Sequence, residues 1–476
     1  TLNLSGNNHF ETTDFTINSG TLNLVNNLAQ QQLAKSFTVT GNFNLNADVD
    51  LNKEVMDRLP SNTKVIGHSY INVDKINLLS DTSKDSVAIP FADEQFKGNV
   101  KYIGASELSK DTQVTTAFAP IYKYSLKYEN REDLGYFVFT KGAGASSGSF
   151  DAYNPAVLAS PVAAQVGGYA AMNETFNYAF KHSDLFSMLP RSQRMAVQYG
   201  GQYAINAPAG LPVQSGVMQD RGIWVQPYAN FESIGLDNGP DVDVTSYGTL
   251  VGGDGEYIRL RNGWGMVTTA YAGYNGSYQS FSGVSTTQNG GIIGATQTFY
   301  KNNFFTAITA SAGASVGDSS TMYGNESFAM LMAGISSKTG YNFEFKEGKY
   351  IIQPSMQMSY TFVNPFNYTN AAGVGIDSDP LHTIQLRPNV KFAANLKHGW
   401  QPYASVGMVW NIMNDTHFAA NNVVLPSMSI KPYVEYGLGV QKTWNDKCTG
   451  YLQAMIRNGG RNGVALSTGF RWALGK

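Results

Sequence analysis

Two stretches of the sequence have the G-x-S-x-G spacing that holds a nucleophilic serine on a tight turn in acyl-transfer enzymes. They are residues 144–148 (Gly-Ala-Ser-Ser-Gly) and 313–317 (Gly-Ala-Ser-Val-Gly). The chemistry needs a strand-to-helix elbow beside an oxyanion hole, but the first copy lies in a Gly/Ser-rich linker and the second within or just after a predicted strand. Both copies are expected by chance in a chain with 49 glycines. We therefore predict no catalytic residue.

Other residues capable of chemistry are scattered. Gly317-Asp318-Ser319 resembles a lipolytic signature but is predicted to lie in a turn. The histidines lack the H-x-x-x-H spacing of a metal site, and we expect solvated or helix-capping roles for all six: His9, His68, His182, His382, His398 and His417. A single cysteine, Cys448, excludes a disulfide framework, and a net charge of −2 gives no nucleic-acid footprint. No metal, cofactor or nucleic acid is predicted.

Polar residues at every second position carry more information. Between residues 430 and 441, apolar side chains at even positions alternate with polar or small ones at odd positions. Successive side chains of a strand point to opposite faces, so one face is apolar and the other polar. If the apolar face meets lipid, the polar face lines a lumen. The same parity gives the predicted pore-lining residues Gln353, Gln357, Arg387, Lys391, Lys431, Glu435, Gln441 and Arg471.

Composition favours a membrane barrel over a soluble sandwich. Charged residues make up 14% of the 476 residues, well below the soluble average of about 25%, and aromatic residues make up 12%. Mean hydropathy is −0.22, and no apolar run is long enough for a transmembrane helix. This combination is typical of an outer-membrane β-barrel.

About twelve segments are predicted to cross the membrane as antiparallel strands. They are residues 222–232, 245–257, 265–275, 290–301, 304–315, 327–337, 350–363, 383–396, 401–414, 429–443, 450–457 and 464–474. Connections such as 302–303 and 397–399 are short, whereas 364–379 and 415–426 are long and polar. We interpret this alternation as the asymmetry between periplasmic turns and surface loops.

The N-terminal part is predicted to be a different β structure. Thr1-Leu2-Asn3-Leu4 recurs at residues 21–24, and Phe15-Thr16-Ile17 is echoed at residues 37–39. A repeat near twenty residues indicates rungs of a parallel β-helix, although two chance copies in a generic β-rich domain are the alternative. Residues 61–141 keep a strand-like pattern without the repeat, as expected for an irregular β cap on the last rung. Residues 142–159 read as a linker.

A thin helix is predicted between linker and barrel. Ser160-Pro161 reads as N-cap and first helical residue, and small residues follow as far as Ala171. A helix over residues 160–181 would span about 30 Å, the hydrocarbon thickness of a bilayer, and would fit a narrow pore. An amphipathic helix packed on a soluble domain is the alternative. The predicted pore-helix residues are Val162, Val166, Met172, Asn173, Phe176 and Phe180.

The order of these parts resembles the classical monomeric autotransporters of type Va secretion, over essentially the whole chain. The most specific pieces are residues 221–228 (Arg-Gly-Ile-Trp-Val-Gln-Pro-Tyr), 400–404, 431–435 and 158–165. The resemblance implies five regions: the end of a passenger β-helix (1–60), an autochaperone-like passenger cap (61–141), a linker (142–159), a pore helix and lead-in (160–220), and the outer-membrane translocator barrel (221–476). It also implies that the passenger N-terminal to the helix is delivered to the cell surface.

The resemblance further implies partners and surroundings. These are outer-membrane lipid and lipopolysaccharide, the barrel-assembly machinery and periplasmic chaperones, with the barrel itself monomeric. The first residues lack the basic start and apolar run of a signal peptide, so we expect the chain to be the C-terminal part of a longer precursor. Any enzymatic activity would then belong to passenger sequence upstream.

Two departures from the family pattern matter. Members usually end in an aromatic residue, whereas this chain ends in Leu-Gly-Lys, so we expect the outward row of Phe470, Trp472 and Leu474 to act as the insertion signal. Some members cut themselves at an Asn-Asn pair in the pore helix. This helix has Asn173 and Asn177 but no such pair, which argues against self-cleavage. The alternatives are a porin-like channel with a soluble N-terminal extension and a soluble β-rich adhesin or enzyme.

Overall fold

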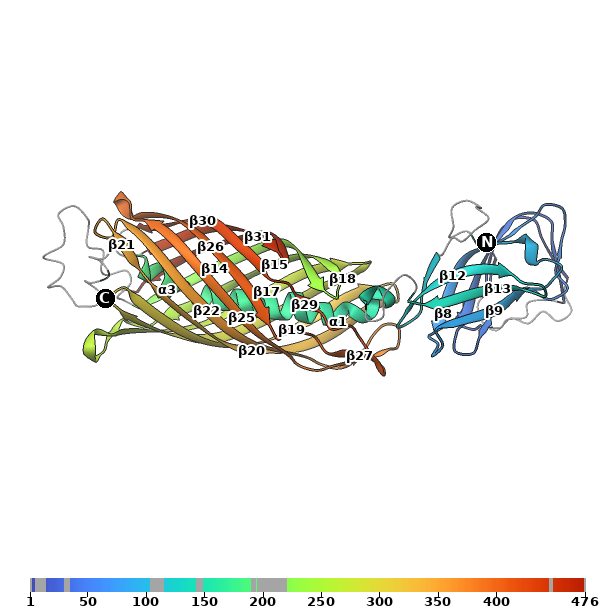
Figure 1. Cartoon of the computed structure of the whole chain (residues 1–476), viewed down its shortest axis with the longest axis horizontal. Coiled ribbons are helices and arrows are strands. Elements are labelled where there is room, and N and C mark those ends of the chain that lie inside the picture. Colours follow the sequence, from blue (N-terminus) through green and yellow to red (C-terminus); the bar gives the residue numbers. More distant parts are fainter. Residues whose placement is uncertain are drawn as a thin grey trace. The chain divides into compact units, whose positions relative to one another are not determined.

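The computed structural model describes residues 2–4, 14–29, 35–102, 115–142, 149–189, 194, 221–444 and 448–474. It contains two compact units: an N-terminal one formed by Thr1–Val157 with the short segment Ala372–Val374, and a C-terminal one formed by Leu158–Ala371 and Gly375–Lys476 (Figure 1). Among the helices described, none combines the length and the apolar character needed to cross a membrane.

The N-terminal unit begins with stacked parallel strands. One sheet has the order β1 (Leu2–Asn3), β3 (Gly20–Asn23), β5 (Phe43–Asp50), β8 (Ile71–Ser80) and β10 (Val100–Tyr102), with β6 (Val55–Met56) beside β5; the other has β2 (Asp14–Ile17), β4 (Ser36–Val39) and β7 (Lys64–Val65). The repeat found in the sequence is the repeat of the rungs, because Leu2 lies opposite Leu22 and Phe15 opposite Phe37. The predicted β-solenoid character of this region is confirmed.

Identical or similar side chains stack along this solenoid. Leu22, Leu45 and Val73 occupy matched positions of successive strands and are fully buried. Outside this core, Asn23 Nδ2 donates to Asn3 Oδ1 at 3.2 Å. The parallel pairing continues through β8 and β10, past residue 60, where we predicted the β-helix to end. The apolar alternation persists there although the sequence repeat has lapsed.

A four-stranded antiparallel sheet follows in the predicted cap region. Its order is β11 (Thr115–Phe118), β12 (Lys123–Asn130), β13 (Gly135–Lys141) and β9 (Ser86–Ala92), with a 3₁₀ turn η1 at Lys97–Asn99. Asp81 anchors the chain entering β12, because its carboxylate accepts the backbone N–H groups of Ile121 at 2.8 Å and Tyr122 at 3.0 Å. Burial raises the pKa of the Asp81 carboxyl above its ordinary value.

Part of the predicted linker, residues 142–159, is folded. Residues 143–148 lie outside the described part of the chain, but two 3₁₀ turns follow, η2 (Phe150–Ala152) and η3 (Pro155–Leu158). Between them Asn154 is buried; its Nδ2 donates to Ala119 O at 2.8 Å and its Oδ1 accepts Ala156 N at 3.0 Å. Residues 150–158 are therefore packed structure rather than linker.

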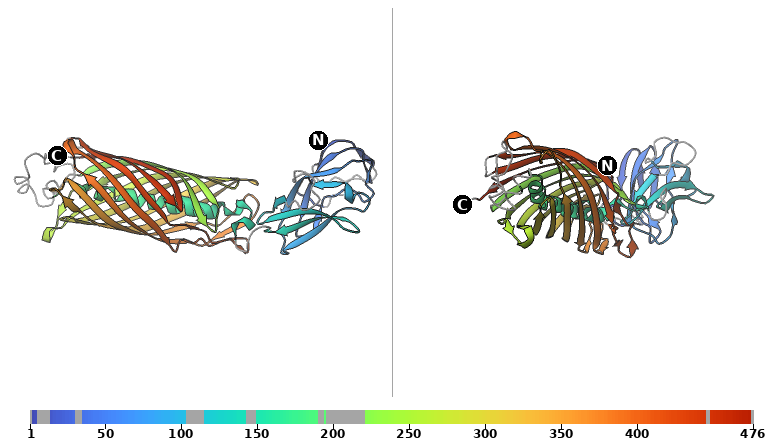
Figure 2. Two further views of the ribbon diagram at one scale, coloured as in Figure 1. Left: turned by 45° about the horizontal axis from the view of Figure 1, so that its top comes forward. Right: turned by 60° about the vertical axis from the view of Figure 1, so that its left-hand side comes forward.

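Twelve of the described strands close into an antiparallel barrel (Figures 1 and 2), which confirms the predicted fold class. In chain order they are β14 (Gly222–Asp237), β15 (Asp241–Asp254), β17 (Gly265–Phe281), β18 (Val284–Lys301), β19 (Phe304–Thr321), β20 (Gly324–Tyr341), β22 (Tyr350–Pro365), β25 (Leu381–Ala394), β26 (Trp400–Ile412), β30 (Tyr433–Trp444), β31 (Cys448–Gly459) and β32 (Arg461–Ala473). Pairing of β14 with β32 closes the ring, so the barrel has no free edge.

Shorter elements decorate the barrel. β16 (Ile258–Arg259), β21 (Phe343–Phe345) and β29 (Ser429–Ile430) extend its sheet, η6 (Arg261–Gly263) and η7 (Lys397–Gly399) form turns, and β23 (Tyr368–Thr369), β24 (Gly375–Ser378), β27 (Phe418–Ala420) and β28 (Val423–Val424) pair across two long loops. Two-residue turns occur at both barrel ends, at 302–303 and 282–283. The predicted alternation of short and long connections therefore holds only for the loops after β22 and β26.

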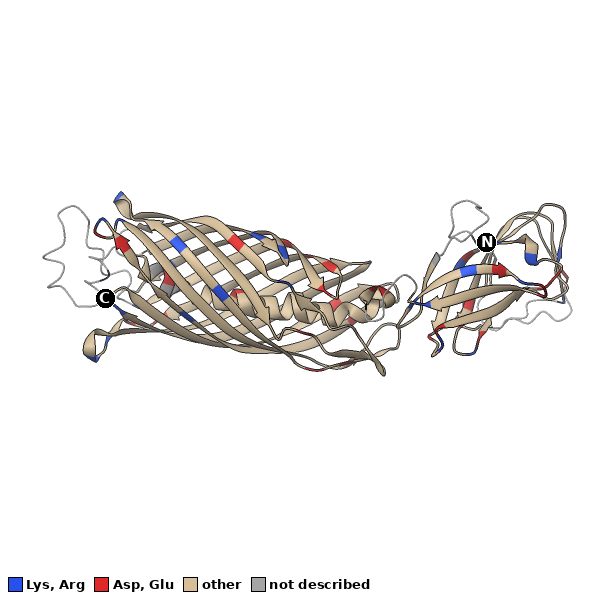
Figure 3. Cartoon of the chain, viewed as in Figure 1, with Lys and Arg blue, Asp and Glu red and all other residues tan. Residues whose placement is uncertain are grey.

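Each predicted strand coincides with a strand of the barrel, but β17 to β20 are longer than predicted, with 17 or 18 residues each. Their extra residues are rich in Gly, Ser and Thr and show little contrast in hydropathy between the two faces. On β30, Val434 and Leu438 are exposed on the outer face, whereas Tyr433 and Glu435 are buried inside. Few strand residues are charged (Figure 3).

Candidate functional site

A helical segment runs through the lumen of the barrel (Figure 2). It consists of α1 (Ala159–Val162), a π-helical stretch η4 (Ala163–Tyr169), α2 (Ala170–Ala179) and α3 (Lys181–Ser187). The predicted helix over residues 160–181 therefore starts one residue earlier and continues further. The predicted N-cap is wrong: Leu158 occupies that position, and Ser160 is a buried residue within the first turn. Pro161 is helical because its nitrogen lies in the first turn, where no intrahelical donor is needed.

The structure places all the predicted pore-helix residues, Val162, Val166, Met172, Asn173, Phe176 and Phe180, in buried positions. Barrel glycines make room for the larger ones. A Cβ at Gly334 of β20 would lie 2.8 Å from Cζ of Phe176, so only glycine lets the ring approach this closely. On the helix itself, a Cβ at Gly168 would lie 2.8 Å from Met330 Sδ and 3.0 Å from Val363 Cγ1. The thin half of the helix is thus in contact with the wall.

Polar bonds fix the N-terminal half of the helix near one mouth of the barrel. Gln165 Nε2 donates to the carbonyl oxygens of Met428, at 2.7 Å, and Asn414. Tyr169 donates its hydroxyl hydrogen to Asn411 and accepts Gln385 Nε2 at 2.8 Å. The helix begins, therefore, where the two long loops emerge from the barrel.

An arginine cluster surrounds the middle of the helix. We define it as Glu174, Glu232, Arg387, Glu435, Arg457 and Arg461. Glu174, on the helix, lies 2.7 Å from Arg457 Nη2 and 3.5 Å from Arg461 Nη2. Glu232 of β14 also pairs with both arginines, at 2.6 Å to Arg461 Nη2, and Glu435 accepts Arg387 Nε at 2.7 Å. Three positive and three negative charges are thus buried together and balance one another.

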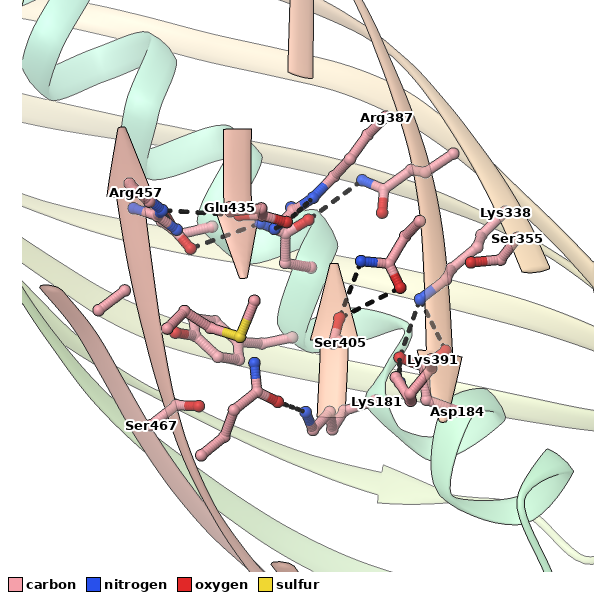
Figure 4. Close-up of a pocket in the computed structure, with 18 residues that line it drawn as sticks. Lys181, Asp184, Lys338, Ser355, Arg387, Lys391, Ser405, Glu435, Arg457 and Ser467 are labelled. Carbon is pink, nitrogen blue, oxygen red and sulfur yellow. Dashed lines mark hydrogen bonds and ion pairs between the residues drawn. The ribbon is translucent and has the colours of Figure 1, made fainter. Parts of the chain in front are cut away.

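A lysine cluster lies about two to three helical turns further on. We define it as Lys181, Asp184, Lys338 and Lys391. The Asp184 carboxylate of α3 accepts hydrogen bonds from two lysines. Lys338 Nζ of β20 lies 2.6 and 2.8 Å from its two oxygens, and Lys391 Nζ of β25 lies 3.0 Å from Oδ2. Lys181 Nζ donates to the neutral Gln453 Oε1 at 2.6 Å and lies 4.4 Å from the centre of the Tyr451 ring. Figure 4 shows the lysine cluster and part of the arginine cluster, including Arg387, Glu435 and Arg457, around one cavity.

The C-terminal end of the helix is held at the opposite mouth. Gln353 Nε2 of β22 donates to Ser187 Oγ at 2.7 Å, and Asn342 donates to the Ser187 carbonyl. Gln401 donates to the carbonyl of Met188. Gln353 lies near the start of β22 and Val363, beside Gly168, near its end, so the helical segment crosses most of the lumen.

The predicted pore-lining residues divide into three groups. Gln353, Gln357 and Lys391 bond the helix, with Gln357 Nε2 reaching Asn177 Oδ1 at 3.3 Å. Arg387 and Glu435 pair within the arginine cluster, whereas Gln441 and Arg471 are buried on the inner wall, and Arg471 Nε lies 2.7 Å from Asp254 Oδ2.

The eighth predicted pore-lining residue, Lys431, was placed wrongly by the prediction. It precedes β30, its side chain is 54% exposed, and its Nζ lies 3.8 Å from an Asp237 oxygen. It does not line the lumen because the neighbouring residues 429–430 have left the main ladder and pair with the end of β14.

Sequence reasoning missed several residues of the site: Glu174, Lys181, Asp184, Glu232, Lys338, Arg457 and Arg461. Strand parity could have found Lys338 and Arg457, since each follows an inward Ser336 or Met455 by two positions. Charges are rare in this barrel, so inward charges on strands point to partners inside the lumen. The carboxylates of Glu174 and Asp184 on the helix are such partners.

The remaining predicted features also have definite places. Phe470 and Trp472 of β32 face outward, half-exposed, with their rings stacked at 6.0 Å, and exposed Leu474 follows the strand. Residues 313–317 lie within β19, with no strand-to-helix elbow, and Asp318 and Ser319 continue the same strand rather than a turn. Residues 144–148 lie outside the described part of the chain.

A closed antiparallel barrel with an apolar outer face, a polar inner face and a helix in its lumen is a plugged barrel of the outer-membrane type. Residues 223–454 match the family model described as the autotransporter beta-domain. The barrel is an outer-membrane autotransporter beta-domain, a type of domain that is not itself an enzyme.

Solved structures with a similar barrel include three translocators. The beta domain of the Bordetella autotransporter BrkA is 17% identical, with 53% of this chain and 99% of that chain covered and a TM-score of 0.45. The transport unit of AIDA-I from Escherichia coli is 13% identical, with 59% of this chain and 96% of that chain covered and a TM-score of 0.46. The translocator domain of NalP from Neisseria meningitidis is 12% identical, with 53% of this chain and 88% of that chain covered and a TM-score of 0.43. A comparison with curated protein sequences gave no match.

Proposed function

We propose that this protein inserts into the outer membrane as a β-barrel and secretes and displays its own N-terminal passenger at the cell surface. The observation that carries the proposal is the path of the chain. The helical segment begins beside Val363 and Asn414 and ends beside Asn342 and Gln353, at the mouth where β14 also begins. Chain N-terminal to Leu158 is therefore joined to the barrel through the lumen.

The chain that precedes the helix leaves the barrel at the mouth that carries the two long loops. The first and last strands of the barrel sequence begin and end at the opposite mouth. Because β14 begins and β32 ends at the other mouth, that mouth would face the periplasm, from which the barrel is inserted. The N-terminal unit would then be exposed at the cell surface.

The contents of the lumen argue against an open porin-like channel. The helix is bonded to the wall at both mouths and by the two charge clusters between them. The cavity beside it measures about 80 Å³, room for a few water molecules. A porin-like function would require the helix to leave.

Membrane and partner interactions belong to the same proposal. The outward row of Phe470, Trp472 and Leu474 supports recognition by the barrel-assembly machinery after passage with periplasmic chaperones. The exposed apolar outer face supports direct contact with lipid and lipopolysaccharide. A ring closed by its own strands needs no second copy, so we infer a monomeric barrel.

Cysteine labelling of intact cells tests the topology. In a Cys448→Ser background, with the chain placed behind a secretion signal, one variant carries Asp133→Cys, at an exposed turn of the N-terminal unit. The matched variant carries Lys397→Cys, exposed at the turn between β25 and β26. A membrane-impermeant maleimide should label the first in intact cells and the second only after the outer membrane is permeabilised. The reverse result, or labelling of neither without permeabilisation, would contradict the proposal.

A further inference from the structure

The cavity between the pore helix and the wall has an unequal charge distribution. Its lining includes the whole lysine cluster, four members of the arginine cluster (Glu174, Arg387, Glu435 and Arg457), and the hydroxyl or amide groups of Ser355, Asn389, Ser405 and Ser467 (Figure 4). Around the arginine cluster every charge has an opposite charge. The lysine cluster has a single carboxylate, Asp184, which pairs with Lys338 and Lys391 but not with Lys181, so with all three lysines protonated two positive charges are in excess.

The geometry concentrates this excess in a small volume. Lys338 Nζ and Lys391 Nζ both contact Asp184 Oδ2, at 2.8 and 3.0 Å. Lys181 is one turn before Asp184 on the same helix, and its described polar partner, Gln453, is neutral. The rings of Tyr403 and Tyr451 contribute only cation–π contacts, at 5.6 Å for Lys391 and 4.4 Å for Lys181.

Buried charge that no protein group balances is costly, because the ion has lost its hydration without gaining a partner. A mobile counter-ion would remove that cost. The cavity volume of about 80 Å³ exceeds the roughly 10–15 Å³ needed for one water, so it can hold a small ion with some of its hydration. Hydroxyl and amide groups in the lining supply further donors.

We propose that this cavity is a binding site for a small inorganic anion such as chloride or phosphate, which offsets the excess positive charge of Lys181, Lys338 and Lys391 and ties the pore helix to β20 and β25. The site does not depend on passenger export, and it predicts that the plugged state depends on the kind of anion and not only on ionic strength.

Thermal unfolding of the full folded chain in detergent tests the site. Midpoints are measured in sodium gluconate, chloride and phosphate at one pH and one ionic strength, because ion pairs also respond to general screening. Gluconate is too large for the cavity. We expect a saturable rise of the midpoint when chloride or phosphate replaces gluconate, as for any ligand that binds only the folded state. The anion with the lower half-saturation concentration identifies the occupant. Equal midpoints in all three salts would overturn the proposal.

Three variants separate an anion site from a structural effect. Lys181→Gln removes one cluster charge without removing a partner of Asp184 and should raise the half-saturation concentration at least tenfold. Lys431→Gln removes an exposed lysine outside the lumen and should leave it unchanged. Asp184→Asn removes the one carboxylate and should lower it, even if the variant is less stable. An unchanged anion dependence in Lys181→Gln would refute the site.

A direct measurement on the unaltered chain does not rely on the folding of any variant. Chloride-35 line broadening should appear on adding the protein to chloride buffer and should be competed away by phosphate. Absence of broadening that phosphate can compete, together with equal midpoints, would exclude both anions.

Discussion

Ser355 and Met356 are neighbours on β22 whose surroundings are opposite. Ser355 lines the cavity beside the lysine cluster, whereas the Met356 side chain is exposed on the outer face, which meets lipid in a membrane barrel. The same charged side chain should therefore have opposite effects at the two positions.

Glu at both positions tests the assignment of faces. Met356→Glu places a carboxylate in lipid and should lower the free energy of unfolding by roughly 1–2 kcal/mol, less than the ~2–4 kcal/mol of a lipid-facing Arg or Lys. Ser355→Glu adds a negative charge beside surplus lysines and should be neutral or stabilising. Urea unfolding in detergent-lipid micelles measures both. If Ser355→Glu is the more damaging change, the strand has the opposite register.

Arg457 holds three carboxylates, those of Glu174, Glu232 and Glu435. Arg457→Met should lower the unfolding free energy by about 3–5 kcal/mol, because it leaves buried carboxylates without their partner. The matched control is Arg131→Met, which breaks a pair with Glu129 at the surface of the N-terminal unit and should cost under about 1 kcal/mol. Equal costs, measured by chemical denaturation of each unit, would mean that the cluster does not hold the helix.

At this scale the sequence was informative about faces but not about partners. Parity placed Gln353, Gln357 and Lys391 on the inner face because a strand alternates strictly. It placed Lys431 wrongly because parity holds only while the ladder continues. The pairing of Glu174 with Arg457, 283 residues apart, depends on how deep the helix lies in the closed barrel, and no local pattern encodes that depth.

At the scale of elements, the helix shows how small residues set the fit between plug and wall. The run of Ala and Gly predicted a thin helix, and the structure has Gly168 against Met330 and Val363. The π-helical stretch over residues 163–169 was not predictable, because π-helical turns are rare and a run of Ala and Gly fits an α-helix equally well.

Gly168→Trp should overpack the lumen. The indole has no space between the helix and β20 or β22, so we expect a cost of about 1–3 kcal/mol or more and loss of the heat-resistant barrel. Cold and boiled samples on a gel measure this as loss of the faster folded band. Gly98→Trp is the control, since nothing lies within 4 Å of a Cβ added there and the N-terminal unit should tolerate it. An unchanged folded band for Gly168→Trp would argue against a tightly fitted helix.

The start of β12 has a pH-dependent anchor in Asp81. Burial raises the pKa of this carboxyl in the folded chain above its value in the unfolded chain, so the folded form binds the proton more tightly. Its contribution to stability should therefore rise as pH falls through the raised pKa towards the unfolded value, and be constant at higher pH. Hydrogen exchange of the Ile121 and Tyr122 amides between pH 4 and pH 7, corrected for the intrinsic rate, measures it. Asp81→Asn should remove this component; an identical pH dependence in both chains would contradict it.

At the scale of the whole molecule, the barrel was the most predictable part. Twelve segments of alternating hydropathy in a charge-poor chain are compatible with few soluble folds. Pairing of β14 with β32 follows because every backbone hydrogen-bonding group at a strand edge needs a partner in lipid. The short sequence repeat likewise predicted stacked rungs, because Leu2 and Leu22 are equivalent only if their strands are parallel neighbours. Loop geometry was less predictable, since β23, β24, β27 and β28 pair through contacts between two separate loops.

Removal of the helix should convert the barrel into an open channel. An eight-stranded barrel is roughly filled by its own side chains, whereas twelve strands leave a lumen that this molecule fills with residues 159–187. Deletion of residues 160–181 should therefore give larger and steadier conductance in planar bilayers than the intact chain. A chain of residues 149–476, which lacks most of the N-terminal unit but keeps the helix, is the control and should stay as closed as the intact chain. If the deletion and the intact chain conduct equally, the helix is not the plug; if the control opens as well, the N-terminal unit, rather than the helix alone, keeps the lumen closed.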